Sequence, residues 1–299
     1  MSSTVSNESQ FVVDLLATLR HEKFSLAAWA RFFARSWNMS RSTASAYPGL
    51  KRSWRRVSIA LGMLAFSLFA VSYGLEGSTI ALRLLPGFLF CVAWQIGDLY
   101  WHLGLNREPQ RSALYSNVGV ANFCTQVRGL IASYVLGRLI GGVPTPTILI
   151  LSAFLCGMVT DMLDGYIARR TRIQSKLGQI SDGEADFCLH LSVTIALIQQ
   201  GNLPLWVGMV MLARFLLPLL AALASYFVRA QPVRFGSTIW GKCAGLAQCL
   251  YFLVLLAPVS LVAITRLVNL PLLLVTLTLM IAAPTAQIVM NMRQEKRSE

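Results

Sequence analysis

The chain has 299 residues, of which 55% are hydrophobic and only 13% are charged. Soluble domains carry roughly 25% charged residues, so this composition argues against a soluble domain and indicates a protein that folds in lipid. The formal net charge of +13 could suggest a nucleic-acid partner, but the basic residues lie in short clusters between long apolar stretches. That distribution is typical of membrane topology, and we expect no nucleic-acid partner.

The first 56 residues form a polar and basic region ahead of the first apolar stretch. Apolar residues fall at helical spacing within 11–19 and within 29–33, which leaves two interpretations open. The region is either an amphipathic helix on the anionic inner leaflet or a pair of cytosolic helices packed on the membrane domain. The stretch 39–56 is interpreted as a linker, and the sequence predicts no cleavable signal peptide.

Eight stretches of mostly apolar residues follow, each about 20 residues long, which is the length a helix needs to cross a bilayer. They are 57–75, 79–101, 117–140, 145–168, 180–200, 204–227, 242–262 and 268–290. The sequence therefore predicts an all-α, polytopic transmembrane helix bundle with about eight spans.

The positions of the basic residues predict the orientation of this bundle. If both termini are cytosolic, most of the 26 Lys and Arg residues lie on the cytosolic side, whereas the opposite loops are short and hold little beyond Glu76 and Arg266. This asymmetry is what the positive-inside rule requires. We expect a multi-pass protein of a bacterial inner membrane with a cytosolic active site.

Four aspartates flank the junction between the fourth and fifth predicted spans. Asp161 and Asp164 are three residues apart, so both carboxylates project from one face of a helix. Asp182 and Asp186 are four residues apart and share a face of the next helix. Because the connector 170–178 is short, the two helices can fold back against each other, and we expect the four carboxylates to converge.

The residue types around these aspartates predict metal-dependent phosphoryl-type transfer. Four carboxylates at low dielectric remain ionised together only if cations lie among them. Ligands that are all oxygen favour a hard ion such as Mg²⁺ or Mn²⁺ over zinc. Gly165 and Ala168 remove bulk beside the acids, and Arg169 is placed to hold a phosphate by two parallel hydrogen bonds. These are the components of phosphoryl transfer.

The same run resembles the signature of the CDP-alcohol phosphotransferase family, D-x2-D-G-x2-A-R-x8-G-x3-D-x3-D. Every fixed position is filled, by Asp161, Asp164, Gly165, Ala168, Arg169, Gly178, Asp182 and Asp186. Two further features are similar to the family, namely Asn122-x2-Thr125-x2-Arg128 one span earlier and Gly241-Lys242 at the start of a later span.

The resemblance implies an architecture and an activity. Residues 111–299 would form a six-helix catalytic domain, after the N-terminal region 1–56 and two additional transmembrane helices within 57–110. The activity implied is transfer of a phosphatidyl group from CDP-diacylglycerol, or another CDP-alcohol, to an alcohol acceptor in the membrane, with release of CMP in phospholipid biosynthesis. Family members commonly form homodimers, which we carry over as an expectation.

The resemblance also implies roles for single residues. Asp161, Asp164 and Asp182 would bind Mg²⁺ or Mn²⁺, and Asp186 would bind metal or act as the catalytic base that takes the acceptor's proton. The residues expected to bind the CDP-linked donor are Gly165, Ala168, Arg169, Ser175 and Gly178.

Several other polar residues leave their roles open. His190 either orients Asp186 or hydrogen-bonds a neighbouring helix, and Arg214 either binds an anionic acceptor or neutralises the acids. Arg128 and Lys242, at span edges, either contact phosphate or extend to the membrane interface. Arg138, toward the outer end of its span, is interpreted as a topology or surface charge.

Two functions of other classes compete with the enzyme. In a transporter the acids would line an ion pathway, but the sequence shows no internal repeat. In a catalytically inactive lipid-binding scaffold a metal ligand tends to be lost, but here all four aspartates are present. The four acids could also be helix-end charges that pair with the basic residues at 169–176. Within the enzyme hypothesis, transfer from a soluble CDP-alcohol to a lipid acceptor remains an alternative.

Overall fold

The computed structural model describes residues 17–108, 113–171, 173–229 and 239–298. Within these ranges the chain forms helices and short connections, with no strand. The elements are α2 (Leu26–Ala46), α3 (Pro48–Glu76), α4 (Ser78–Trp101), η1 (Leu103–Leu105), α5 (Val120–Ile140), α6 (Thr147–Thr171), α7 (Lys176–Gln199), α8 (Leu205–Arg229), α9 (Ile239–Leu255), η2 (Val259–Leu261) and α10 (Val262–Ser298).

The prediction of an all-α membrane bundle is confirmed. Each of the eight predicted spans overlaps one of the helices α3 to α10. Among the described residues, α3, α4, α6 and the Val262–Thr285 part of α10 are long and apolar enough to cross a bilayer. The helices α5 and α7, which carry the polar side chains described below, fall outside that set. The chain is thus an integral membrane protein.

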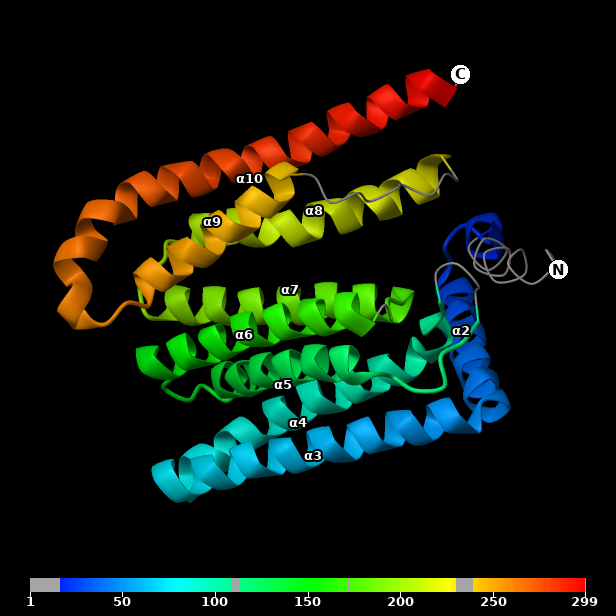
Figure 1. The fold of residues 1–299 in the computed structure, drawn as a ribbon, viewed down its shortest axis with the longest axis horizontal. Helices are drawn as coiled ribbons and strands as arrows, with labels where there is room; N and C mark the ends of the chain where they lie inside the picture. Colours follow the sequence, from blue (N-terminus) through cyan, green and yellow to red (C-terminus); the bar gives the residue numbers. More distant parts are fainter. Residues whose placement is uncertain (1–16, 109–112, 172, 230–238, 299) are drawn as a thin grey trace. The chain divides into compact units, whose positions relative to one another are not determined.

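The chain divides into two compact units, and the helices α6 and α7 contribute residues to both. The first unit consists of Met1–Pro144 and Leu155–Leu189, and the second of Thr145–Phe154 and His190–Glu299. In the first unit, α3, α4 and α5 lie side by side (Figure 1) around buried apolar residues that include Leu61, Leu84 and Leu130. Large apolar side chains on the outer face of α3, such as Phe66, are exposed, as lipid contact requires.

In the second unit, α9 packs against α10, and α8 also contacts α10. Phe252 and Tyr251 of α9 are buried, and the Thr276 hydroxyl of α10 donates a hydrogen bond of 3.3 Å to the carbonyl of Ala247. Polar links of this kind hold helices together in lipid, where the hydrophobic effect does not drive helix association.

The N-terminal region is helical where it is described, and α2 packs on the end of α4. The Trp101 indole donates a hydrogen bond of 2.6 Å to the Ser36 hydroxyl, and the rings of Phe33 and Trp101 lie 5.7 Å apart. These contacts favour the second interpretation of this region, a helix packed on the membrane domain. The apolar residues at 11–16 lie outside the described residues.

The interpretation of 39–56 as a linker is wrong. The helix α2 continues to Ala46, and α3 begins at Pro48 after a break at Tyr47. Proline is favoured at the first position of a helix because its fixed φ suits the helix and its missing N–H has no partner there in any case. Pro48 therefore starts a helix here.

Arg138 is not a surface charge, which corrects its sequence-based interpretation. Its side chain is 1% exposed and pairs in a bidentate manner with Glu76, at 2.5 and 2.9 Å. A second hydrogen bond of its Nη2, at 2.5 Å, goes to the carbonyl of Pro144. The two charges compensate each other, and the pair joins the C-terminal ends of α3 and α5.

The crossing of α4 and α5 depends on a glycine. A Cβ atom at Gly137 would lie 2.8 Å from the backbone nitrogen of Phe88, a distance that requires one helix to move. We expect Gly137→Ala to destabilise the protein by about 1–3 kcal/mol, the usual cost of overpacking. The matched control is Gly62→Ala in α3, where no atom lies within 4 Å of the new Cβ. Thermal melting in detergent should show a lowered Tm for Gly137→Ala alone. An equal Tm for both variants would contradict the close contact of α4 and α5 at Gly137.

Candidate active site

Four aspartates from two helices surround one arginine from a third. Nη1 of Arg128, on α5, lies 2.5 Å from a carboxylate oxygen of Asp161 and 3.3 Å from one of Asp186. Its Nη2 lies 3.1 Å from Asp164 and also pairs with Asp182. The structure therefore brings together all four acids that the sequence singled out. They surround Arg128, a residue that the sequence analysis did not pair with them.

The interpretation of Arg128 as a residue that extends to the membrane interface is wrong. Its side chain is fully buried, at 0% exposure, and its guanidinium faces the acids. A guanidinium withdrawn from water is stable only with several compensating charges, which these acids provide. A signal for this role was present in the sequence, because residues 122, 125 and 128 recur every three positions and can share a helix face.

Asp164 is the most enclosed of the four acids. Its side chain is 10% exposed, and its Oδ2 accepts hydrogen bonds from the Thr125 hydroxyl at 2.8 Å and from Arg128 at 3.1 Å. Thr125 and Arg128 both belong to α5, so this helix fixes the carboxylate of α6 at two points. Thr125 thus positions a site residue, a role that sequence reasoning did not assign.

The other three acids have a geometry that suits a hard cation. Asp161, Asp182 and Asp186 each offer an oxygen, and these three atoms lie within 4.8 Å of one another. Carboxylate oxygens are the ligands that Mg²⁺ and Mn²⁺ prefer. Arg128 alone cannot balance four negative charges. The residues present therefore fit the predicted Mg²⁺ or Mn²⁺, and the assignment of all four aspartates as ligands remains a prediction.

A cavity of about 180 Å³ opens beside the acids, lined by residues of the first unit only. Two of the aspartates, Asp164 and Asp182, form part of its wall. All five residues expected to bind the donor also line it, namely Gly165, Ala168, Arg169, Ser175 and Gly178. The structure thus places the predicted donor-binding residues and the predicted metal ligands in one site, and their roles stay predictions.

The glycines of this cavity allow close approach. A Cβ at Gly165 would lie 3.1 Å from Nη1 of Arg169, so the guanidinium lies over the bare backbone of the preceding turn. A Cβ at Gly178 would lie 2.8 Å from Oδ1 of Asn122, whose amide donates to the Val118 carbonyl at 2.6 Å. Gly178 therefore lets α7 approach α5 where the cavity begins.

Ser175 has a structural role in addition to its predicted one. Its hydroxyl accepts a hydrogen bond of 3.1 Å from the backbone N–H of Gly178, which caps the first turn of α7. The cap holds the start of α7 at the cavity wall. The free N–H groups of a helix start attract anions, so this end of α7 suits a phosphate in the cavity.

Two residues with open roles lie in the second unit. His190 packs against the rings of Phe154, Phe215 and Phe252, and its Nε2 lies 3.8 Å from Sγ of Cys249. These contacts favour the interpretation of His190 as a packed histidine.

Arg214 donates a hydrogen bond of 3.0 Å to Gln248 and lies 4.6 Å from the centre of the Phe215 ring. Its binding of an anionic acceptor stays a prediction. Lys242 is exposed.

Comparison with known proteins agrees with this site. Residues 118–287 match the CDP-alcohol phosphatidyltransferase family, and the chain belongs to that family. The chain is also similar to a protein of Streptomyces coelicolor named cardiolipin synthase (CMP-forming), with 45% identity over 56 residues. That match covers 19% of this chain and 26% of the relative. No solved structure matches the chain significantly.

Replacing Arg128 tests its role as the counter-ion of the acids. Without divalent metal, we expect Arg128→Gln to lose roughly 3–5 kcal/mol of stability, because the acids lose their only shared cation in the described structure. Adding Mg²⁺ should raise the Tm of this variant more than that of the wild type, since the metal no longer faces a competing positive charge.

The control is Arg138→Gln, which breaks the other buried arginine pair. Its Tm should fall without any extra response to Mg²⁺. The measurement is thermal melting in detergent with and without Mg²⁺. Equal responses of the two variants to Mg²⁺ would show that Arg128 does not compete with a metal for the acids.

Gly178 provides a test of the approach between α5 and α7. Gly178→Ala places a methyl group against the buried Asn122, so we expect lower stability and weaker binding of a CDP-linked ligand. Gly183→Ala is the matched control on the same helix, because nothing lies within 4 Å of its Cβ. This control should keep or slightly raise the Tm, since alanine favours a helix over glycine by up to about 1 kcal/mol. If Gly178→Ala binds the ligand as tightly as the wild type, the close approach of α5 and α7 at Gly178 is not needed for ligand binding.

Proposed function

We propose that the protein transfers a phosphatidyl group from CDP-diacylglycerol to an alcohol and releases CMP. The observation that carries this proposal is a cavity in which the five expected donor-binding residues lie together with Asp164 and Asp182. Membership of the CDP-alcohol phosphatidyltransferase family supports the reaction class. The relative that is named as CMP-forming supports CMP as the leaving product.

Binding of the donor follows from the cavity wall. Arg169 can hold the diphosphate by parallel hydrogen bonds, and the backbone N–H groups at the start of α7 add further donors. Gly165 and Ala168 leave room for the nucleotide beside the helix backbone. A divalent Mg²⁺ or Mn²⁺, when bound by the aspartates, supplies positive charge to the phosphate oxygens during transfer.

Asp186 is the residue that we assign as base. Its side chain is 32% exposed, and its contact with Arg128 is the longest of the four ion pairs, at 3.3 Å. Its carboxylate is therefore more accessible to an acceptor hydroxyl than that of Asp164, which is 10% exposed and is bound by Thr125 and Arg128 together.

The step balances in atoms and charge. The acceptor hydroxyl gives its proton to Asp186, and its oxygen forms a bond to the phosphorus that carries the diacylglycerol. The bond from that phosphorus to the bridging oxygen breaks, and CMP leaves with this oxygen. The buried guanidinium of Arg128 keeps the remaining carboxylates in place during the transfer.

Two considerations bear on the class of acceptor, and they favour different molecules. The Streptomyces relative is named as a cardiolipin synthase, which points to phosphatidylglycerol as the acceptor. Basic residues such as Arg214 and Lys242 instead favour a phosphorylated polar alcohol, for example glycerol phosphate or inositol phosphate. A soluble CDP-alcohol with a lipid acceptor is the remaining variant. We further propose a cytosolic active site in a bacterial inner membrane and a homodimer.

The first experiment measures CMP release by purified protein with CDP-diacylglycerol, Mg²⁺ or Mn²⁺, and each acceptor separately. We expect release that requires one acceptor and falls at least about 100-fold in Asp186→Asn, since a general base contributes roughly 10²–10⁴-fold. Donor binding by this variant should persist and serves as the folding control. Donor binding without CMP release from wild-type protein, for every acceptor, would favour a scaffold, and metal flux in vesicles without CMP release would favour a transporter.

A second experiment separates the two neighbouring arginines at the end of α6. Arg169 lines the cavity, whereas Arg170 donates a hydrogen bond of 2.7 Å to the Tyr166 hydroxyl. We expect Arg169→Gln to raise the KM for the CDP-linked donor at least about ten-fold, the effect of losing a charge-assisted pair. Arg170→Gln should leave the KM near the wild-type value. Equal effects of both substitutions on the KM would show that Arg169 does not bind the donor specifically.

A further inference from the structure

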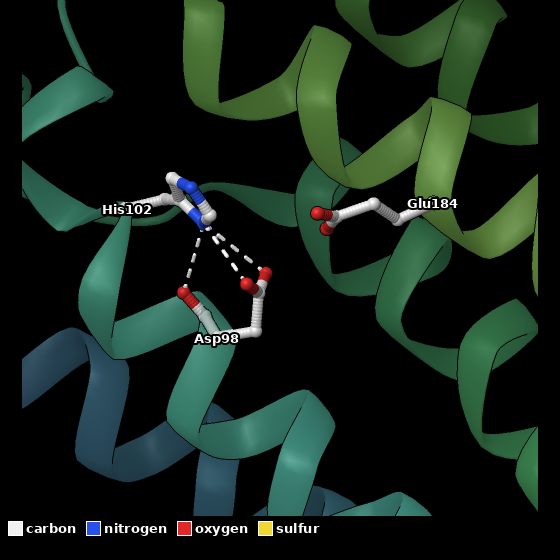
Figure 2. Close-up of side chains that lie close together, drawn as sticks. All are labelled: Asp98, His102 and Glu184. Atoms are coloured by element: carbon white, nitrogen blue, oxygen red, sulfur yellow. Dashed lines mark hydrogen bonds and ion pairs between the residues drawn. The ribbon is translucent and has the colours of Figure 1, made fainter. Parts of the chain in front are cut away.

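A second cluster of ionisable side chains lies in the first unit, apart from the four aspartates. Figure 2 shows Asp98 and His102, from the end of α4, facing Glu184 of α7. Nδ1 of His102 lies 3.2 Å from the Asp98 carboxylate, and each of the three residues offers one ligand atom within 4.8 Å of the others. No role described above uses these three residues.

We propose that Asp98, His102 and Glu184 form a binding site for a divalent transition-metal ion of the zinc class.

The ligand chemistry distinguishes this site from the aspartate site. Imidazole nitrogen together with carboxylate oxygen suits Zn²⁺ and related ions, whereas an all-oxygen set suits Mg²⁺. Three protein ligands leave further positions to water, as in zinc sites that keep an open coordination position. The two carboxylates also face each other closely and are therefore stabilised by a shared cation.

The electrostatics of His102 support a cation at this position. Burial alone would lower the pKa of His102, but the hydrogen bond and charge of Asp98, together with the charge of Glu184, outweigh it and raise the pKa. The ring therefore lies in a strongly negative field. A metal ion can take the place of the proton that this field favours, because a metal needs the neutral ring nitrogen as its ligand.

The position of Glu184 gives the site a consequence for the rest of the molecule. Glu184 lies between Asp182 and Asp186 on α7, but residues two apart on a helix point to different faces. One face of α7 therefore carries the acids around Arg128, and another faces α4. Since α4 precedes residues 118–287, a bound metal would tie a helix outside the family match to a helix of the active site.

The test uses the full chain in detergent, with any purification tag removed and metals stripped by a chelator. Excess Mg²⁺ fills the aspartate site, and Zn²⁺ is then titrated by calorimetry. We expect stoichiometric Zn²⁺ binding that weakens at least roughly ten-fold in Glu184→Gln and in Asp98→Asn, and that is lost in His102→Gln. The chain has three histidines, and His21→Gln, at an exposed position, is the matched control that should bind Zn²⁺ like the wild type.

A spectroscopic readout separates a metal site from a structural hydrogen-bond cluster. Cu²⁺ binds such sites more tightly than Zn²⁺, and its electron paramagnetic resonance spectrum should show coupling to one imidazole nitrogen. That coupling should vanish in His102→Gln and persist in His21→Gln. If Zn²⁺ affinity and the Cu²⁺ spectrum are the same in wild type, Glu184→Gln and His102→Gln, the proposal is wrong and the cluster only joins α4 to α7. Both readouts are independent of phosphatidyl transfer, so failure of the proposed function would not affect them.

Discussion

The active-site half of the molecule depends on one electrostatic constraint, the balance between a buried guanidinium and four carboxylates. Arg128 has no exposed surface and could not be held there without the acids, because an unpaired ion in such surroundings is strongly unfavourable. The acids in turn repel one another and need positive charge among them. One arginine cannot balance four carboxylates, so the site retains negative charge, as a site for a divalent metal requires.

This balance also sets the positions of three helices. Arg128 belongs to α5, Asp161 and Asp164 to α6, and Asp182 and Asp186 to α7, so each ion pair is a link between helices. Small residues make these links possible by allowing short distances between backbones. Where α7 begins, Gly178 leaves room for a buried amide of α5, and on α6 a glycine leaves room for the side chain of an arginine. The cavity is the space that these small residues leave beside the acids.

The sequence predicted the features that depend on local spacing. Hydropathy located the eight helices α3 to α10, four of which are long and apolar enough over their described residues to cross a bilayer. The convergence of the four aspartates followed from intervals of three and four residues on helices joined by a short connector.

Features that depend on distant partners were missed. For Arg128, at a span edge, the sequence offered phosphate contact or extension to the interface but not pairing with the acids, because those partners lie 33 to 58 residues further along the chain. Arg138 was assigned to the surface for the same reason, since its partner Glu76 is 62 residues away. Pro48 was taken for a linker residue although proline also starts helices.

The helix α7 contributes acidic residues both to the candidate active site and to the second cluster. Ionisable residues within the membrane are costly and are retained where they face a partner or a polar cavity. The helix α7 carries Asp182 and Asp186 toward Arg128 and Glu184 toward His102. Both faces are therefore compensated by cationic or protonatable groups on the helices α5 and α4. The same short helical segment therefore supplies side chains to both clusters. A metal bound at the second cluster would thus be held by the helical segment that carries Asp182 and Asp186.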